Sequence, residues 1–179
     1  VVGGGNVAMD AARTALRMGA GKVTVVYRRS MEELPARKEE VENAIEEGIE
    51  MMLLTNPVEI LGDKKVEGIK CNKMQLGQPD ERGRATPIPV EGSEFVINCD
   101  QVIIAIGTSP NPLLAKSAKN LKTSPKGTII INENGETSIE NVYAGGDAVI
   151  GAATVILAMG AGKKAAASIV KKLRGKHGS

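Results

Sequence analysis

The stretch Gly3-Gly4-Gly5-Asn6-Val7-Ala8 decides the fold, because glycine-rich turns of this kind join a buried strand to a helix. Small and apolar residues then recur at helical spacing as far as Met18, and Gly19 is expected to end that helix. A run of β-branched residues at 23–27 follows and is typical of a buried strand. Strand, turn, helix and strand form a βαβ unit, so the sequence predicts an α/β protein with a parallel sheet.

The glycine turn also fits the dinucleotide-binding fingerprint in the form Gly3-x-Gly5-x-x-Ala8. The first glycine allows the tight turn, the second lets the backbone approach a pyrophosphate, and the small third residue lets helix and strand pack closely. The start of the helix offers free N–H groups and a partial positive charge to phosphates. Nucleotide binding is therefore predicted here, and a glycine turn that serves packing alone is the alternative.

The end of the second strand indicates which dinucleotide would bind. Sites for NAD usually carry a carboxylate there, about 20 residues after the glycine turn, to bind the ribose hydroxyl. Here Tyr27 is followed by Arg28 and Arg29, and the first carboxylate is Glu32. Guanidinium groups bind a phosphate in a bidentate manner, so the pair favours NADP(H) over NAD(H). The alternative is that both arginines form a solvated surface pair.

Glutamates are frequent in the helix expected at about 36–47, and a solvated helix face is their simplest explanation. Glu40 could still reach a ribose. The full set is Glu39, Glu40, Glu42, Glu46 and Glu47.

The remaining elements divide the chain in two. A third strand is expected at 49–54, an inserted antiparallel meander at about 57–98 with a polar loop at 77–86, and a buried strand at 101–107. Residues 108–112 contain two prolines and form the expected linker. Beyond it we expect a strand at 128–132, a turn at 134–135 and a last helix at about 152–173.

A second glycine-rich segment lies before the last helix. Gly145 and Gly146 are followed by Asp147, and residues 151–154 open the helix. An aspartate after such a turn can accept a hydrogen bond from a polyol, and the helix start can face the carbonyl or phosphate of a cofactor. Taken alone, Asp147 is more simply a turn residue or a helix cap.

Composition excludes several classes of function. The hydrophobic fraction of 42% suffices for a core, and a net charge of +2 argues against nucleic acid or an anionic membrane surface as partner. Three aromatic residues cannot make a base-stacking surface, and no apolar run is long enough to span a membrane. Cys71 and Cys99 form no CxxC pair, which suggests a reducing compartment such as the cytoplasm.

The chain offers little material for side-chain catalysis. The one histidine, His177, is expected in a solvated tail, which argues against a zinc site or a Ser-His-Asp triad. We therefore predict no catalytic side chain and no metal ligand. The first residue, Val1, is not methionine and leads directly into the glycine turn, so the sequence is expected to be a piece of a longer protein.

Several of these motifs together resemble one family, the small (beta) subunit of NADPH-dependent glutamate synthase. The resemblance extends over essentially the whole chain, and it includes relatives such as the flavoprotein subunit of ferredoxin:NADP transhydrogenase-type enzymes and the amino-terminal part of dihydropyrimidine dehydrogenase. The motifs that carry it are VGGGNVAMDAAR at 2–13, VYRRS at 26–30, PARKEE at 35–40, VIIAIG at 102–107, VYAGGD at 142–147 and GAATVILAMG at 151–160.

The resemblance implies a flavoprotein whose NADPH domain is inserted into an FAD domain. Residues 1–107 would be a Rossmann-like NADPH-binding domain of three layers, and residues 108–179 the C-terminal portion of the FAD-binding domain. Two groups of site residues follow from it. Those implied at NADPH are Gly3, Gly4, Gly5, Asn6, Val7, Arg28, Arg29 and Gly107, the last close to the nicotinamide. Those implied at FAD are Gly146, Asp147, Gly151, Ala153 and Thr154.

Such enzymes transfer a hydride from NADPH to FAD and pass electrons through iron–sulfur clusters to a large (alpha) subunit, where glutamine and 2-oxoglutarate become glutamate. The iron–sulfur segments and the first FAD turn of the family are absent from this sequence. The chain alone is thus expected to bind FAD incompletely and to be inactive. A transhydrogenase-type subunit and a non-catalytic NADP(H)-binding module are the alternatives, whereas a disulfide reductase would need the CxxC pair that is lacking.

Overall fold

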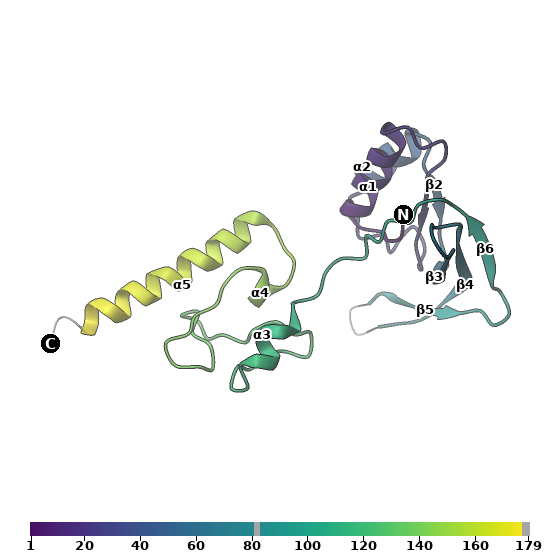
Figure 1. Cartoon of the computed structure of the whole chain (residues 1–179). Helices are drawn as coiled ribbons and strands as arrows, with labels where there is room; N and C mark the ends of the chain where they lie inside the picture. The colour runs from purple at the N-terminus through teal and green to yellow at the C-terminus, as the bar shows by residue number, and fades with distance from the viewer. Residues whose placement is uncertain (81–82, 177–179) are drawn as a thin grey trace. The chain divides into compact units, whose positions relative to one another are not determined.

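The computed structural model describes residues 1–80 and 83–176 of the chain. Its contacts divide the chain into two compact units, Val1–Gly107 and Thr108–Ser179. Figure 1 shows the elements of each unit. The cofactor that each unit binds stays a prediction, and His177 lies outside the described residues.

The first unit begins with parallel strands and two helices. In chain order these elements are α1 (Asn6–Arg17), β1 (Thr24–Val26), α2 (Lys38–Glu46) and β2 (Glu50–Met52). Strands β1 and β2 pair in parallel, and Val2 forms parallel bridges to Val26 on one side and Ile104 on the other. The carboxyl ends of these segments therefore lie at one edge, where the glycine turn and the residues after β1 are found.

Two apolar clusters place this parallel layer in the middle of the unit. On one face, Met9 of α1 and Ala44 of α2 pack with Val25 of β1, and all three are fully buried. On the other face, Val2 and Val26 pack with Ile69 and Cys71. The second cluster joins the parallel layer to the antiparallel sheet, so the unit has the three layers predicted for it.

The antiparallel sheet is the inserted meander that the sequence predicted. It contains β3 (Thr55–Leu61), β4 (Gly68–Pro79), β5 (Ala85–Pro89) and β6 (Phe95–Asn98). The long strand β4 pairs with β3, β5 and β6, in each case antiparallel. Together with the helices and the parallel strands, this sheet confirms the α/β class.

The strand expected at 101–107 is wrong in part. Among the described residues of the unit, this segment has one bridge, from Ile104 to Val2, and it forms no extended ladder. Ile104 is 55% exposed and Ile106 is 71% exposed, so the segment is not buried within the unit. The segment lies at the edge of the parallel layer, because in the described unit it pairs with Val2 on one side and with no strand on the other. Its β-branched composition did not distinguish this edge position from a central one.

The described part of the second unit, residues 108–176, contains three helices, α3 (Pro112–Ser117), α4 (Asp147–Ile150) and α5 (Val155–Lys176). The strand expected at 128–132 is wrong: the described structure has one isolated bridge in this range, between Ile129 and Thr123, and a second beyond it, between Glu136 and Tyr143. The turn at 134–135 is confirmed, with the Gly135 N–H bonded to the Asn132 carbonyl at 3.0 Å. The tight turn reverses the chain before a longer ladder can form.

Helix α5 begins three residues later than expected, because Thr154 caps it. The Thr154 hydroxyl accepts the Leu157 N–H at 3.4 Å. The helix packs closely on the glycine-rich turn before α4, where a Cβ placed on Gly145 would lie 3.0 Å from the backbone of Ala161. No helix in the described part of the chain is both long and apolar enough to cross a membrane.

Candidate functional site

The three glycines of the turn have different surroundings. Gly3 has φ +143°, and a Cβ placed there would lie 2.3 Å from the Ala105 carbonyl oxygen. A Cβ on Gly4 would lie 2.6 Å from ring carbons of Tyr27. A Cβ on Gly5 would meet nothing within 4 Å. Packing thus accounts for the first two glycines, whereas the open space at Gly5 is the cradle that a phosphate group could enter.

The start of α1 lies directly after this open position. Gly5 is the N-cap residue and supplies no side-chain cap, and its carbonyl accepts the N–H groups of Ala8 and Met9. The first N–H groups of a helix have no partner within the helix, so those of Asn6 and Val7 are available to an anion. Val7 is 70% exposed, whereas Ala8 is fully buried, as expected for the residue that lets α1 approach the strands.

The structure separates the two arginines after β1. Arg28 is exposed. Arg29 is 7% exposed, and its Nε donates to the Ala85 carbonyl of β5 at 2.8 Å. The two guanidinium groups therefore have different surroundings, because Arg29 is held through its Nε in the interface between the parallel layer and the meander, and the expected contact of Arg29 with a 2′-phosphate stays a prediction.

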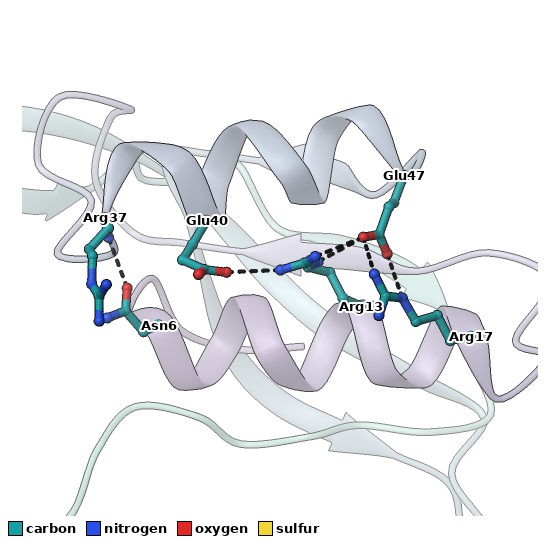
Figure 2. A network of polar contacts seen from close by, with 6 residues as sticks. All are labelled: Asn6, Arg13, Arg17, Arg37, Glu40 and Glu47. Atoms are coloured by element: carbon teal, nitrogen blue, oxygen red, sulfur yellow. Dashed lines mark hydrogen bonds and ion pairs between the residues drawn. The ribbon is translucent and has the colours of Figure 1, made fainter.

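A third arginine, which the glycine and YRR motifs did not indicate, lies at the same edge. Arg37 is exposed and is the N-cap residue of α2, so it stands where the chain enters the helix that follows β1. Its backbone N–H donates to Oδ1 of Asn6 at 2.8 Å. Figure 2 shows its side chain running back beside Asn6 at the start of α1. The Pro-Ala-Arg sequence just before a helix was the signal that could have identified it.

The connection between β1 and α2 packs on the glycine turn. The Tyr27 hydroxyl donates to the Glu33 carbonyl at 2.7 Å, and the Ala36 N–H donates to the Gly4 carbonyl at 3.0 Å. Leu34 also contacts this turn, since a Cβ on Gly4 would lie 2.8 Å from its side chain. The loop that carries Arg28 and Arg37 is thus fixed against the turn that would hold a pyrophosphate.

Glu40 forms an ion pair through one of its carboxylate oxygens, and its contact with a ribose stays a prediction. Arg13 donates to Glu40 at 2.8 Å and to Glu47 at 2.9 Å, and Arg17 donates to Glu47 at 3.0 Å (Figure 2). These bonds join α1 to α2. The hydrogen bond from Arg17 and the charge of Arg13 hold the pKa of the Glu47 carboxyl below its usual range. The other glutamates predicted on this helix face, Glu39, Glu42 and Glu46, are exposed as expected.

The end of the first unit is exposed at the residue implied near the nicotinamide. Gly107 has φ +89°, and a Cβ placed there would meet nothing within 4 Å. A second feature of this unit, an open cavity of about 940 Å³, includes Val1, Lys22 and Cys99 in its lining. It lies at the amino ends of the parallel segments, whereas dinucleotides bind at the carboxyl ends of such strands, so we do not assign it to the nucleotide.

In the second unit, two of the implied FAD residues line one open cavity. Its volume is about 1210 Å³, and its lining includes Asp147 of α4 and Gly151, together with residues of the segment 108–111. Gly146 has φ +73° and turns the chain into α4, so its role in the structure is to place Asp147. Asp147 is itself exposed and bonds through its carbonyl to the Gly151 N–H at 3.0 Å.

The remaining implied FAD residues lie outside this lining. Ala153 and Thr154 are exposed just before α5, and the Thr154 hydroxyl is engaged as the helix cap. Cys71 is fully buried and Cys99 is partly exposed, and neither forms a disulfide. Burial raises the pKa of the Cys71 thiol. Within the described residues, no group of three or more His, Cys, Asp or Glu side chains could hold a metal ion.

Curated relatives match nearly the whole chain. The NADP(+)-dependent formate dehydrogenase subunit beta of Moorella thermoacetica is 45% identical over 176 residues, which are 97% of this chain and 25% of the relative. The glutamate synthase [NADPH] small chain of Halomonas elongata is 41% identical over 177 residues, 97% of this chain and 38% of the relative. The NADPH-Fe(3+) oxidoreductase subunit beta of Geobacter sulfurreducens is 40% identical and is covered over 29% of its length. The chain therefore spans well under half of each of these relatives, and the resemblance to glutamate synthase small subunits is confirmed.

Solved structures and a family model agree on the fold. The thioredoxin reductase of T. acidophilum superposes with a TM-score of 0.74 at 28% identity, over 96% of this chain and 51% of that protein. FprA of Mycobacterium tuberculosis in complex with NADPH superposes with a TM-score of 0.72 at 19% identity, over 97% of this chain and 52% of FprA, a likeness of fold alone. The pyridine nucleotide-disulphide oxidoreductase model matches residues 1–168. With the glycine turn, the parallel edge and these matches together, the chain belongs to the pyridine nucleotide-disulphide oxidoreductase family.

Proposed function

We propose that this chain is part of an NADPH-oxidising flavoprotein, and that its first unit binds NADP(H) at the carboxyl edge of the parallel segments. The observation that carries the proposal is the open position at Gly5, directly before the uncapped start of α1. The Gly5 position leaves room for a pyrophosphate, and the free N–H groups of Asn6 and Val7 would bind it.

The charge around this edge supports NADP(H) rather than NAD(H). Arg28 and Arg37 are exposed cations at the two ends of the loop that packs on the glycine turn. In the proposal they bind the 2′-phosphate. Arg29 supports the loop from the interior through its bond to the β5 carbonyl. A guanidinium bound to phosphate makes short, charge-assisted hydrogen bonds, which a ribose hydroxyl could not replace.

The second unit is proposed to complete an FAD site. Its open cavity of about 1210 Å³ has room for part of a large ligand, and Asp147 and Gly151 lie in its lining. When bound, NADPH is the hydride donor and FAD the acceptor, so the chemistry belongs to the cofactors. The chain's own contribution is to bind and orient the two cofactors. This role needs no catalytic side chain, and the sequence predicts none.

The electron acceptor is proposed from the names of the relatives. They are called subunits of a glutamate synthase, a formate dehydrogenase and an Fe(3+) oxidoreductase, so their names share NADP(H) and differ in the reaction to which it is coupled. We assign this chain to a protein of the glutamate synthase small-chain type, with iron–sulfur clusters and a larger partner subunit that receives the electrons. A transhydrogenase-type partner would use the same two cofactor sites.

The test is a parallel titration of the full chain with NADP⁺ and NAD⁺ at low and high salt. The proposal expects tighter NADP⁺ binding that weakens as salt rises, because charge contacts with a phosphate are screened. Arg28→Ala is expected to lower NADP⁺ affinity about tenfold or more, the loss of one charge-assisted contact. Arg174→Ala, which removes an exposed arginine of α5, is the matched control and should change nothing.

Two outcomes would count against the proposal. Equal binding of both dinucleotides by a folded chain would remove the 2′-phosphate assignment. Absence of any binding by a folded chain would leave the glycine turn with a structural role alone. A second measurement addresses turnover: the whole protein should show flavin absorbance that bleaches on addition of NADPH, whereas a non-catalytic NADP(H)-binding module would not.

A further inference from the structure

The starts of the two helices that follow the glycine turn and β1 are joined by one side chain. Oδ1 of Asn6, the first residue of α1, accepts the backbone N–H of Arg37, the N-cap residue of α2, at 2.8 Å. The two residues are 31 positions apart in the sequence. In Figure 2 this bond stands at one end of the α1–α2 interface, and the ion pairs of Arg13 and Arg17 stand along the rest of it.

The bond fixes which way the Asn6 amide faces. A backbone N–H can only donate, so the amide oxygen must point to Arg37 and is not directed at a ligand. The Arg37 side chain supplies no cap to α2, and its backbone is extended, with ψ 145°. Asn6 is thus the side chain that holds the backbone of Arg37 at the start of α1, next to the open position at Gly5.

The ion pairs farther along cannot do the same. Arg13 contacts Glu40 in the first turn of α2 and Glu47, the C-cap residue of this helix, and both contacts join side chains and leave the Arg37 backbone untouched. The residue before Arg37 is held separately, through the Ala36 N–H and the Gly4 carbonyl at 3.0 Å. Asn6 therefore holds the backbone atoms of Arg37 from which the guanidinium side chain extends.

We propose that Asn6 is a positioning residue for cofactor choice: it holds Arg37 at the edge where a 2′-phosphate would lie, and so sets the preference for NADP(H) over NAD(H). This inference rests on the proposed function of the first unit. It assigns to Asn6 a role separate from that of its backbone N–H, which faces the pyrophosphate common to both dinucleotides.

The test is a double-mutant cycle read as the ratio of the NAD⁺ and NADP⁺ dissociation constants of the full chain. Asn6→Ala is expected to lower NADP⁺ affinity about tenfold, equal to about 1.4 kcal/mol, with NAD⁺ affinity within about twofold of wild type. In an Arg37→Ala background the bond to Asn6 remains, because it uses the backbone N–H. Adding Asn6→Ala there is expected to leave the ratio unchanged, since the guanidinium that Asn6 positions is gone.

The ratio separates positioning from loss of structure. Partial unfolding lowers the apparent affinity for both dinucleotides by the same factor, so it does not move the ratio. Thermal unfolding of each variant is measured alongside. If Asn6→Ala does not fold, Asn6→Gln, which moves the amide oxygen by one methylene, takes its place with the same expected result.

Three results would overturn the inference. Equal losses for NAD⁺ and NADP⁺ would make Asn6 a pyrophosphate contact. An unchanged ratio in Asn6→Ala, or an equal loss of preference in the Arg37→Ala background, would show that it does not act through Arg37. A wild-type chain without any NADP⁺ preference would instead refute the proposed function itself, so the two failures can be told apart.

Discussion

Replacing Gly5 by alanine should separate cofactor binding from folding. The new Cβ would meet nothing within 4 Å of the protein, and Gly5 has φ −90°, which alanine adopts freely. Alanine is a poorer N-cap than glycine by less than about 1 kcal/mol, and it removes about 0.4–1 kcal/mol worth of freedom from the unfolded chain. The two effects oppose each other, so the free energy of unfolding should change by no more than about 0.5 kcal/mol.

The same methyl group should obstruct a ligand. It would stand in the space through which a pyrophosphate reaches the first N–H groups of α1. Loss of one charge-assisted hydrogen bond is worth about 1.5–3 kcal/mol, so NADP⁺ affinity should fall roughly 10- to 100-fold. Isothermal titration calorimetry gives the affinity, and thermal unfolding without ligand gives the stability.

Two further glycines serve as controls. Gly21→Ala also adds a methyl group in open space, but beyond the C-terminal end of α1. It should alter neither the NADP⁺ affinity nor the free energy of unfolding. Gly4→Ala places a Cβ 2.6 Å from the Tyr27 ring, so it should destabilise the fold by about 1–3 kcal/mol. NADP⁺ binding at wild-type affinity by Gly5→Ala would refute the assignment of the pyrophosphate to the start of α1.

Three other substitutions test particular contacts. Arg29→Ala removes the buried bond to the β5 carbonyl and should lower the free energy of unfolding by about 1–3 kcal/mol in urea titrations, with NADP⁺ affinity of the folded chain retained. Glu47→Gln should lower the melting temperature at neutral pH but not in acid. The hydrogen bond from Arg17 lowers the pKa of the Glu47 carboxyl in the folded chain. The carboxylate therefore stabilises the fold fully above the unfolded pKa of about 4.3, and this stabilisation is lost as pH falls through the lower pKa of the folded chain. A melting difference that persists well below that pH would contradict this. Gly145→Ala should destabilise the second unit, because its Cβ would lie 3.0 Å from the Ala161 backbone in α5; proteolysis that leaves this unit intact would disprove the tight packing.

Local patterns in the sequence predicted most of the first unit. Helix α1 ends at Arg17, one residue before the expected end, because its apolar periodicity stops just before Gly19. The antiparallel meander was also predicted from alternation and turn residues. Where the prediction failed, at 101–107 and 128–132, β-branched runs occupy edges or single bridges, and composition alone does not distinguish an edge from a central strand.

The candidate site was less predictable, because long-range contacts decide the roles of its side chains. Arg28 and Arg29 are neighbours in the sequence, yet one is exposed and the other bonds to Ala85, 56 positions away. Arg37 was not assigned, since its place beside the glycine turn depends on a bond to Asn6 across 31 positions. The glycine turn was found from spacing, but the division of its residues between packing and open space required coordinates.

The burial of Arg29 has a consequence for redesign of cofactor choice. Replacing both arginines of the YRR motif would change the exposed Arg28 together with Arg29, which joins two layers of the unit. Such a double variant could unfold, and its cofactor affinity could then not be measured. Keeping Arg29 confines the engineering problem to Arg28 and Arg37, whose side chains are exposed and can be exchanged for acidic or neutral ones while the interior stays intact.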